Sequence, residues 1–426
     1  MRLTRRRVIG SAAAGILVAA AMSTALTPAI AADPVTVTFW DLQWGNADYQ
    51  TVAQKLVDQF NTENPDIHVD LTIVPWTNWF ETFVTAVASG SAPDVSTGAS
   101  FQPNYFYAQD AILPLDDMIA QMKADGSLAD IPEANLEAYH VDGHYIALPW
   151  AVDFAGWYYN KDILAKAGVK PPTSWDEFRA AAKAATGNGV YGVLSSGDMD
   201  KVLITMTQNN NGGFFTADGK ADMTGERTKE TVEFMAALQA DGSVDPATAG
   251  YDGNHAVQAF LAGKSAFFLY GPSLLANADA ATAAKIGLLS PMTGPHGDKG
   301  TNAWNAGIMA YSQTKHPTET MKFIRWWSEH ETPLWTQGGG GMLPVRASIR
   351  KDPYFVNNEV DNIFANEYLP VAKALYSKAD QSFPQLNAVE GDGFLAKLSQ
   401  QTWQGKPVTE TLPAAQQRLE QILNGQ

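Results

Sequence analysis

Aromatic side chains are the residues of this chain best suited to contact another molecule. The 426 residues include 12 Trp, 14 Tyr and 19 Phe, and a protein core rarely needs so many indoles. Trp40 and Trp44 flank the turn after the first predicted strand, and Trp76 and Trp79 bracket a predicted helix cap. Loops of this kind can carry an aromatic face into a ligand site. We therefore expect some of these indoles to face a ligand.

Patterns that carry catalysis or bind a metal are missing from the sequence. The adjacent pairs Asp116-Asp117 and Asp176-Glu177 lie at predicted helix starts, where carboxylates stabilise the helix dipole, and neither has a catalytic setting. Ser196 is not in a G-x-S-x-G elbow, and the 7 His form no H-E-x-x-H pair. The chain has no Cys, which removes disulfides, thiolate metal sites and thiol nucleophiles. We expect a protein that is not an enzyme and binds no metal or cofactor.

Length and charge limit the possible partners. A chain of 426 residues is too long for one core, since single cores rarely exceed about 250–300 residues, so two domains are expected. The net charge is −16, from 29 basic and 45 acidic side chains. This balance argues against nucleic acid as a partner and against adhesion to anionic lipid.

Residues 1–32 have the features of an export signal. Four Arg precede an Ala-rich apolar stretch, 8–26, and small residues at 28–32 predict cleavage after Ala31 or Ala32. The string TRRRVI at 4–9 is similar to a twin-arginine signal, with an ordinary Sec signal or an uncleaved anchor as alternatives. Cleavage would leave 25 basic and 45 acidic side chains, a net charge of −20.

Strands and helices are expected to alternate after this segment. Strict alternation of apolar residues predicts strands at 35–40 and 67–74, a short strand follows at 94–98, and helical periodicity predicts helices at 49–61 and 78–89. This order predicts a parallel sheet, in which ligands bind at the carboxyl ends of the strands. Further on, we expect a hairpin turn at 142–144, strands at 156–160 and 265–270, and helices at 161–167, from 173 and at 319–329.

Several blocks in order carry a resemblance to a known family. The strongest is YYNKD at 158–162, followed by AG at 167–168 and PPTSWDEF at 171–178. SGSAPDV at 89–95, HYIALPW at 144–150, FLAGKSAF at 260–267 and LPVR at 343–346 fit the same pattern. From about residue 40 to residue 412, the chain resembles the extracellular solute-binding proteins of sugar ABC transporters, the family of maltose-binding protein.

The resemblance implies an α/β fold of two lobes, each a β-sheet flanked by helices, with the ligand cleft at a crossover hinge. The chain would cross between lobes near 148–151, 303–306 and 341–345. We therefore expect lobe 1 to comprise 33–148 and 304–342, and lobe 2 to comprise 149–303 and 343–426. Pro and Gly residues at those three places agree with crossings there.

The ligand implied by this family is a carbohydrate, whose hydroxyl groups need polar partners and whose C–H faces need aromatic ones. Asp153 is the first polar candidate because the family has a ligand carboxylate there, and we expect it to lie beside Trp304 at the floor of the cleft. The alternatives are an Asp that caps a buried turn and an indole that packs the hinge. The full set of expected binding residues is Trp40, Trp44, Trp76, Phe101, Asp153, Tyr270, Ser273, Trp304, Asn305 and Arg346.

Some of these positions depart from the family pattern. Ser273 follows Gly271-Pro272, where maltose-binding protein has a stacking Trp, and Phe101 lies in a stretch where that protein has a Trp and an acid. Maltose itself is therefore not expected. Arg346 has a hinge salt bridge as its alternative role, and Tyr270 and Trp40 have core packing as theirs.

The sequence thus predicts a monomeric solute-binding protein of an ABC importer that delivers a carbohydrate, expected to be an oligosaccharide, to membrane permease subunits. We expect the protein to act outside the cytoplasm. It lacks the lipidated Cys by which some relatives are tethered. The alternatives are a secreted glycosidase, which needs two carboxylates about 5–10 Å apart, and a binding protein for a non-sugar solute. The sugar's identity, length and linkage stay open.

Overall fold

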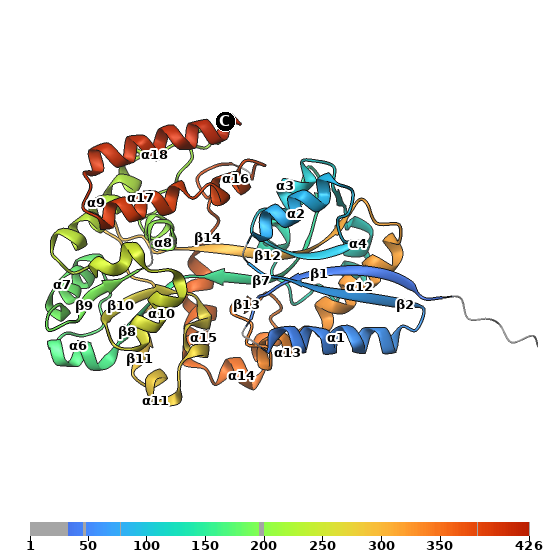
Figure 1. The fold of residues 1–426 in the computed structure, drawn as a ribbon, viewed down its shortest axis with the longest axis horizontal. Helices are drawn as coiled ribbons and strands as arrows, with labels where there is room; N and C mark the ends of the chain where they lie inside the picture. Colours follow the sequence, from blue (N-terminus) through green and yellow to red (C-terminus); the bar gives the residue numbers. More distant parts are fainter. Residues whose placement is uncertain (1–32, 46–47, 77, 196–199, 381, 426) are drawn as a thin grey trace, which may run out of the picture. The chain divides into compact units, whose positions relative to one another are not determined.

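The computed structural model describes residues 33–45, 48–76, 78–195, 200–380 and 382–425. The expected export signal, 1–32, lies outside the described residues. Residues Pro34–Gln426 fold as one unit that holds two β-sheets with helices around them (Figure 1). The alternation of strands and helices that the sequence predicts is confirmed.

The larger sheet begins with the parallel strands that apolar alternation predicts. β1 (Val35–Leu42) pairs in parallel with both β2 (Ile67–Val74) and β3 (Val95–Ala99). The helices α1 (Tyr49–Glu63) and α2 (Trp79–Ala88) connect these strands, close to their predicted ranges. The parallel β-α-β-α-β arrangement is therefore confirmed, and the carboxyl ends of its strands meet at one edge.

Helices cover both faces of this sheet, because alternate residues of β1 point to opposite sides. Val37 and Phe39 are fully buried in one cluster with the apolar stripe of α1. Leu42 belongs to a second cluster, which contains Phe83 of α2. Figure 1 shows α1 on one side of the sheet and α2 on the other.

The smaller sheet has its own core. Its strands, in spatial order, are β11 (Ile286–Leu288), β8 (Gly156–Asn160), β10 (Ser265–Tyr270) and β9 (Tyr191–Leu194). The helix α7 (Trp175–Ala185) packs on it and begins as predicted, since Ser174 accepts a hydrogen bond from the Glu177 amide at 3.3 Å. Trp175 is 3% exposed and packs in this core.

Two antiparallel pairings place the three predicted crossing segments side by side. β7 (Leu148–Phe154) pairs antiparallel with β12 (Thr301–Tyr311) on one side and with β13 (Leu343–Pro344) on the other. β12 continues along the larger sheet to pair with β3. Figure 1 shows β7 and β12 running from the larger sheet toward the smaller one.

The remaining strands and helices have the following bounds. The shorter strands are β4 (Ile112–Leu113), β5 (His140–Val141), β6 (His144–Tyr145) and β14 (Ala372–Lys373). The other α-helices are α3 (Gln102–Tyr107), α4 (Asp116–Asp125), α5 (Glu133–Glu137), α6 (Lys161–Ala167), α8 (Lys201–Asn209), α9 (Glu226–Ala240), α10 (Gly253–Leu261), α11 (Ala280–Ala283), α12 (Pro317–His330), α13 (Pro333–Thr336), α14 (Pro353–Val356), α15 (Glu359–Ile363), α16 (Leu386–Gly391), α17 (Phe394–Trp403) and α18 (Val408–Leu423). None of the helices in the described part of the chain has both the length and the apolar character needed to cross a bilayer.

Candidate functional site

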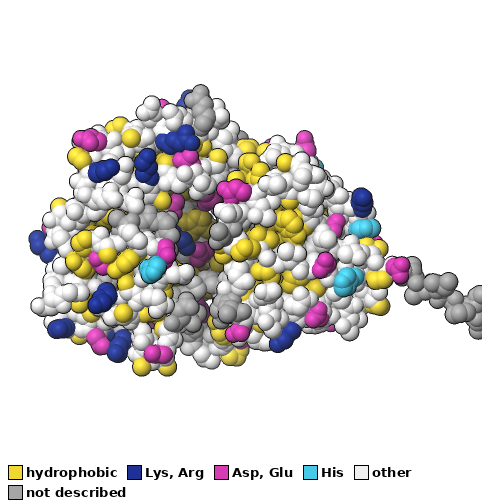
Figure 2. Space-filling model, viewed as in Figure 1, with side chains coloured by type: hydrophobic (Ala, Val, Ile, Leu, Met, Phe, Trp, Pro, Cys, Tyr) yellow, Lys and Arg dark blue, Asp and Glu magenta, His cyan; other side chains and the backbone are white. Residues whose placement is uncertain are grey.

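A cavity of about 430 Å³ lies where the crossing strands meet the ends of both sheets. Figure 2 shows the surface hollowed near the centre of the view, with acidic and basic side chains close together in the hollow. The described residues that line the cavity are Trp44, Trp76, Ala99, Ser100, Asp153, Asp200, Lys201, Ile204, Tyr270, Gly271, Ser273, Trp304, Asn305, Ala306, Gly341, Met342 and Glu390. Its size is within the usual range for small-molecule sites.

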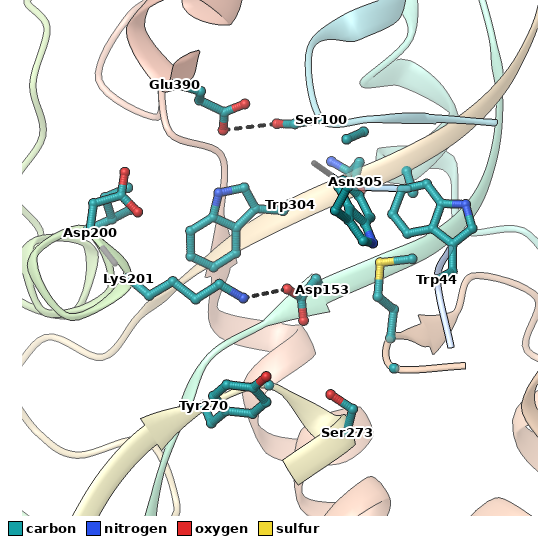
Figure 3. Close-up of a pocket in the computed structure, with 17 residues that line it drawn as sticks. Trp44, Ser100, Asp153, Asp200, Lys201, Tyr270, Ser273, Trp304, Asn305 and Glu390 are labelled. Carbon is teal, nitrogen blue, oxygen red and sulfur yellow. Dashed lines mark hydrogen bonds and ion pairs between the residues drawn. The ribbon is translucent and has the colours of Figure 1, made fainter. Parts of the chain in front are cut away.

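Asp153 and Trp304 lie directly opposite each other at the floor of this cavity. Asp153 on β7 is in register with Trp304 on β12. Directly opposed residues of an antiparallel pair place their side chains on the same face. The expectation that these two residues lie side by side is therefore confirmed, and Figure 3 shows both side chains at the cavity.

Lys201 connects these two residues from a third element, the first turn of α8. Its Nζ lies 2.8 Å from Oδ2 of Asp153 and 5.1 Å from the ring centroid of Trp304 (Figure 3). Burial on its own would lower the pKa of Lys201, but the Asp153 carboxylate outweighs it, so that the pKa is raised. Lys201 therefore stays charged and fixes both a carboxylate and an indole.

Two further carboxyl groups reach the cavity, from Asp200 and Glu390. Burial raises the pKa of Asp200 to about 6. Burial also raises the pKa of Glu390 to about 8, against a hydrogen bond from Ser100 Oγ at 3.0 Å. Ser100 follows β3 and Glu390 belongs to α16, so this hydrogen bond joins segments 290 residues apart across the cavity.

Indoles form the wall of the cavity on the side of the larger sheet. The rings of Trp44 and Trp76 meet edge to face, with centroids 4.9 Å apart. Trp76 donates a hydrogen bond from Nε1 to the Gln43 carbonyl at 2.7 Å, yet the residue stays 42% exposed. Trp76 therefore leaves part of its ring uncovered at the cavity, where an apolar face of a ligand can contact it.

A buried carboxyl group holds Trp44 in place. Trp44 Nε1 donates to Thr97 Oγ1 at 2.9 Å, and Thr97 donates to Oδ1 of Asp41 at 2.6 Å. Tyr49 donates its hydroxyl to Oδ2 of Asp41 at 3.0 Å. Burial raises the pKa of Asp41 to about 7 against these hydrogen bonds. Asp41 thus positions the indole through Thr97 without lining the cavity itself.

The pKa of Asp41 predicts how stability changes with pH. Between the ordinary pKa of 3.8 and about 7, the folded protein keeps a proton that the unfolded chain releases, so this group makes the free energy of unfolding fall as pH rises. We expect the melting temperature of Asp41→Asn to fall less steeply than that of the unaltered protein between about pH 5 and pH 7. Thermal unfolding across that range tests this. Asp70→Asn, at an exposed site on β2, should keep the original slope; equal slopes for all three proteins would contradict the role of Asp41.

Seven of the ten expected binding residues line the cavity: Trp44, Trp76, Asp153, Tyr270, Ser273, Trp304 and Asn305. The structure does not bring Trp40, Phe101 and Arg346 into that lining. Trp40 packs edge to face on Phe83 in the second cluster of the larger sheet, with centroids 5.4 Å apart. Its strand continues to Leu42, so Trp40 lies before the strand end.

Phe101 and Arg346 have structural contacts instead. The ring of Phe101 meets that of Tyr376 at 5.8 Å, and both pack against the core of the smaller sheet. Arg346 is 6% exposed, and its guanidinium donates to the Ser328 carbonyl at 2.7 Å and to Oδ1 of Asp130 at 2.6 Å. The alternative reading of Arg346, a salt bridge at the hinge, fits these contacts.

Residues that the sequence analysis missed supply much of the cavity's charge. Asp200, Lys201 and Glu390 belong to no block of the family resemblance. One signal pointed to Lys201: a cation in the first turn of a helix is disfavoured by the helix dipole, which suggests that a tertiary contact holds it there. Glu390 gives no comparable signal, because α16 meets the cavity only through the tertiary fold.

The chemistry available in this cavity is recognition by hydrogen bonds and by aromatic stacking. The carboxyl groups and Asn305 can accept or exchange hydrogen bonds with hydroxyl groups, and the indoles can cover apolar faces. Among the described residues, no group of three or more His, Asp or Glu side chains is arranged to hold a metal ion.

Comparison with known proteins identifies the family. The family model described as bacterial extracellular solute-binding protein matches residues 44–332, and the chain belongs to this family. A solved sugar transporter from Arthrobacter chlorophenolicus A6 with bound laminaribiose matches with a TM-score of 0.83 and 30% identity, over 90% of this chain and 98% of that one. The two-lobe fold with helix-flanked sheets is thereby confirmed.

Two curated relatives cover much of the chain. A putative binding protein of Brucella abortus (strain 2308) is 26% identical over 70% of this chain and 74% of its own length. A putative ABC transporter periplasmic-binding protein of Escherichia coli (strain K12) is 22% identical over 88% of this chain and 90% of its own length. The matched family is one of binding proteins rather than enzymes.

Proposed function

We propose that this chain is the solute-binding component of an ABC importer and captures a carbohydrate in the cavity between its two lobes. The observation that carries the proposal is the pairing of Asp153 with Trp304 at the cavity floor, a polar group beside a stacking surface. Sugars present the matching combination of hydroxyl groups and C–H faces. The bound laminaribiose of the Arthrobacter chlorophenolicus structure supports this class of ligand.

The lobes belong to the same proposal. We assign 33–148 and 304–342 to lobe 1, and 149–303 and 343–426 to lobe 2, with the hinge at the paired crossing strands. The side-by-side pairing of β7, β12 and β13 supports a hinge at this place. Ligand contacts from both lobes would favour the closed arrangement.

We place the protein outside the cytoplasm after removal of residues 1–32, where it would act as a monomer and hand its ligand to membrane permease subunits. The family description and the Escherichia coli relative support export and an ABC importer as the partner. We expect no lipid anchor on a Cys, since the chain contains none.

Binding without turnover is the expected behaviour of the purified chain. A thermal-shift screen against neutral mono- and oligosaccharides should identify ligands that raise the melting temperature, because a ligand that binds only the folded state stabilises it by mass action. Calorimetry should then give one site per chain, and the sugar should be recovered unchanged after long incubation. Release of new reducing ends would favour the glycosidase alternative, and stabilisation only by non-sugar solutes would exclude a carbohydrate as ligand.

A further inference from the structure

Carboxyl groups dominate the charged lining of the cavity. Asp153 on β7, Asp200 before α8 and Glu390 on α16 reach it from three separate elements. Lys201 is the single Lys or Arg among the described residues of the lining.

Lys201 is already engaged by the protein. Its Nζ lies 2.8 Å from Oδ2 of Asp153, and both side chains are largely buried, with exposed fractions of 28% and 20%. An acidic ligand that recruited this ammonium would leave Asp153 unpaired in a partly buried site, which costs far more than losing an exposed ion pair. The cavity therefore has no spare cation for an acidic ligand among its described residues.

Burial already disfavours the charged forms of the other two acids, Asp200 and Glu390. Burial raises the pKa values of Asp200 and Glu390, and the charge of Asp200 raises that of Glu390 further. The charge of Asp200 thus acts on Glu390 across the cavity. A further negative charge on a ligand would be repelled by Asp200, and also by Glu390 once that group is ionised, in a poorly solvated space.

The start of α8 does not provide an anion site instead. α8 is nine residues long, and the positive end of its dipole lies at the cavity. Asp200 stands at that end as the N-cap residue, and its carboxyl group already supplies the negative charge that the dipole favours. An acidic ligand approaching there would meet this carboxyl group first.

We infer that the ligand of this cavity is a saccharide that carries no acidic group, and that sugar acids are rejected by the carboxylate of Asp200 and, where it is ionised, by that of Glu390. This inference rests on the proposed function and narrows its class of ligand. Hydroxyl groups can accept from Lys201 and donate to the carboxylates without disturbing the pair that Lys201 makes with Asp153. A carboxylate on the ligand can only accept.

Matched pairs of sugars test this inference. The probes are laminaribiose, cellobiose and maltose, each compared with the derivative in which one primary CH2OH group is oxidised to a carboxylate. Titration calorimetry at about pH 9, above the pKa of about 6 for Asp200 and about 8 for Glu390, should show the acidic derivative of any binder to be at least about tenfold weaker. Tighter or equal binding of the acidic derivative would overturn the inference and leave the proposed function standing.

A double variant separates the cavity's own charge from the charge of the whole protein. Asp200→Asn with Glu390→Gln should shrink the difference between neutral and acidic sugar at least about threefold, because both replacements keep the side-chain size. Asp200 makes no side-chain cap hydrogen bond, and Gln can still accept from Ser100. The matched control, Asp70→Asn with Glu410→Gln, removes two exposed acids outside the cavity and should keep the original ratio.

The outcomes of this comparison are distinct. An unchanged ratio in the double variant would overturn the role of Asp200 and Glu390. An equal change in the control would assign the discrimination to net charge and overturn the inference too. Absence of binding by every neutral and acidic probe, in a protein that unfolds cooperatively, would instead count against the proposed function.

Discussion

Trp304→Ala and Asp153→Asn are each expected to weaken saccharide binding by at least about tenfold. Trp304→Ala removes the stacking face of the cavity floor, which is worth about 0.5–1.5 kcal/mol in addition to the apolar area that it buries. The Asp153 substitution removes a charged hydrogen-bond partner, which typically costs about 1.5–3 kcal/mol, or about 10- to 150-fold in affinity. It also frees Lys201, whose Nζ lies 2.8 Å from the carboxylate.

Trp326→Ala is the matched control for the indole. Trp326 is also half-buried, but it lies on α12, packs against Phe60 of α1 and donates to Oε2 of Glu63 at 2.8 Å, outside the cavity lining. Its replacement should leave the affinity within about twofold. Calorimetric titration of each variant with the same sugar measures the effect. An unchanged affinity for both Trp304→Ala and Asp153→Asn would mean that the ligand does not lie on the cavity floor.

Arg346→Met is expected to lower the free energy of unfolding by about 3–5 kcal/mol, the usual cost of breaking a buried ion pair from one side. The guanidinium is buried and donates to Asp130, to Ser328 and to the Ser127 carbonyl at 2.8 Å. The same substitution should leave the affinity of the folded fraction for sugar unchanged, because Arg346 does not line the cavity.

Arg179→Met provides the comparison for this second effect. Arg179 pairs with Asp241 at 2.6 Å, but its side chain is 43% exposed, and exposed pairs contribute about 1 kcal/mol or less. Urea unfolding of both variants gives the two free energies. If the free energy of unfolding falls no more for Arg346→Met than for Arg179→Met, the structural role of Arg346 is contradicted. If the affinity for sugar falls while the stability does not, Arg346 is a binding residue after all.

The frame of the molecule could be predicted from its sequence because local patterns determine it. Alternation at 35–40 and 67–74 and the cap at Ser174 specify strands and a helix start without knowledge of the rest of the chain. The pairing of Asp153 with Trp304 followed from the expectation of neighbouring crossing strands, and the register of β7 with β12 agrees.

The charged part of the cavity could not be predicted in the same way. Lys201 meets Asp153 across 48 residues, and Ser100 meets Glu390 across 290. The local periodicity of the sequence cannot predict such contacts, since they depend on how α8 and α16 pack against the crossing strands. Phe101 is the opposite case, a residue that was expected at the site but does not line the cavity. The family resemblance suggested a ligand contact for Phe101, but the tertiary fold brings Tyr376 against its ring.

The central claim is that a carbohydrate binds on the cavity floor, and calorimetric titration of three proteins side by side tests it most directly. The unaltered chain, Trp304→Ala and Arg346→Met should be titrated with the same neutral saccharide at a temperature where all three are folded. We predict one site per chain, an affinity at least about tenfold weaker for Trp304→Ala, and an unchanged affinity for Arg346→Met. Equal affinities for the unaltered chain and Trp304→Ala, or a loss confined to Arg346→Met, would contradict the account.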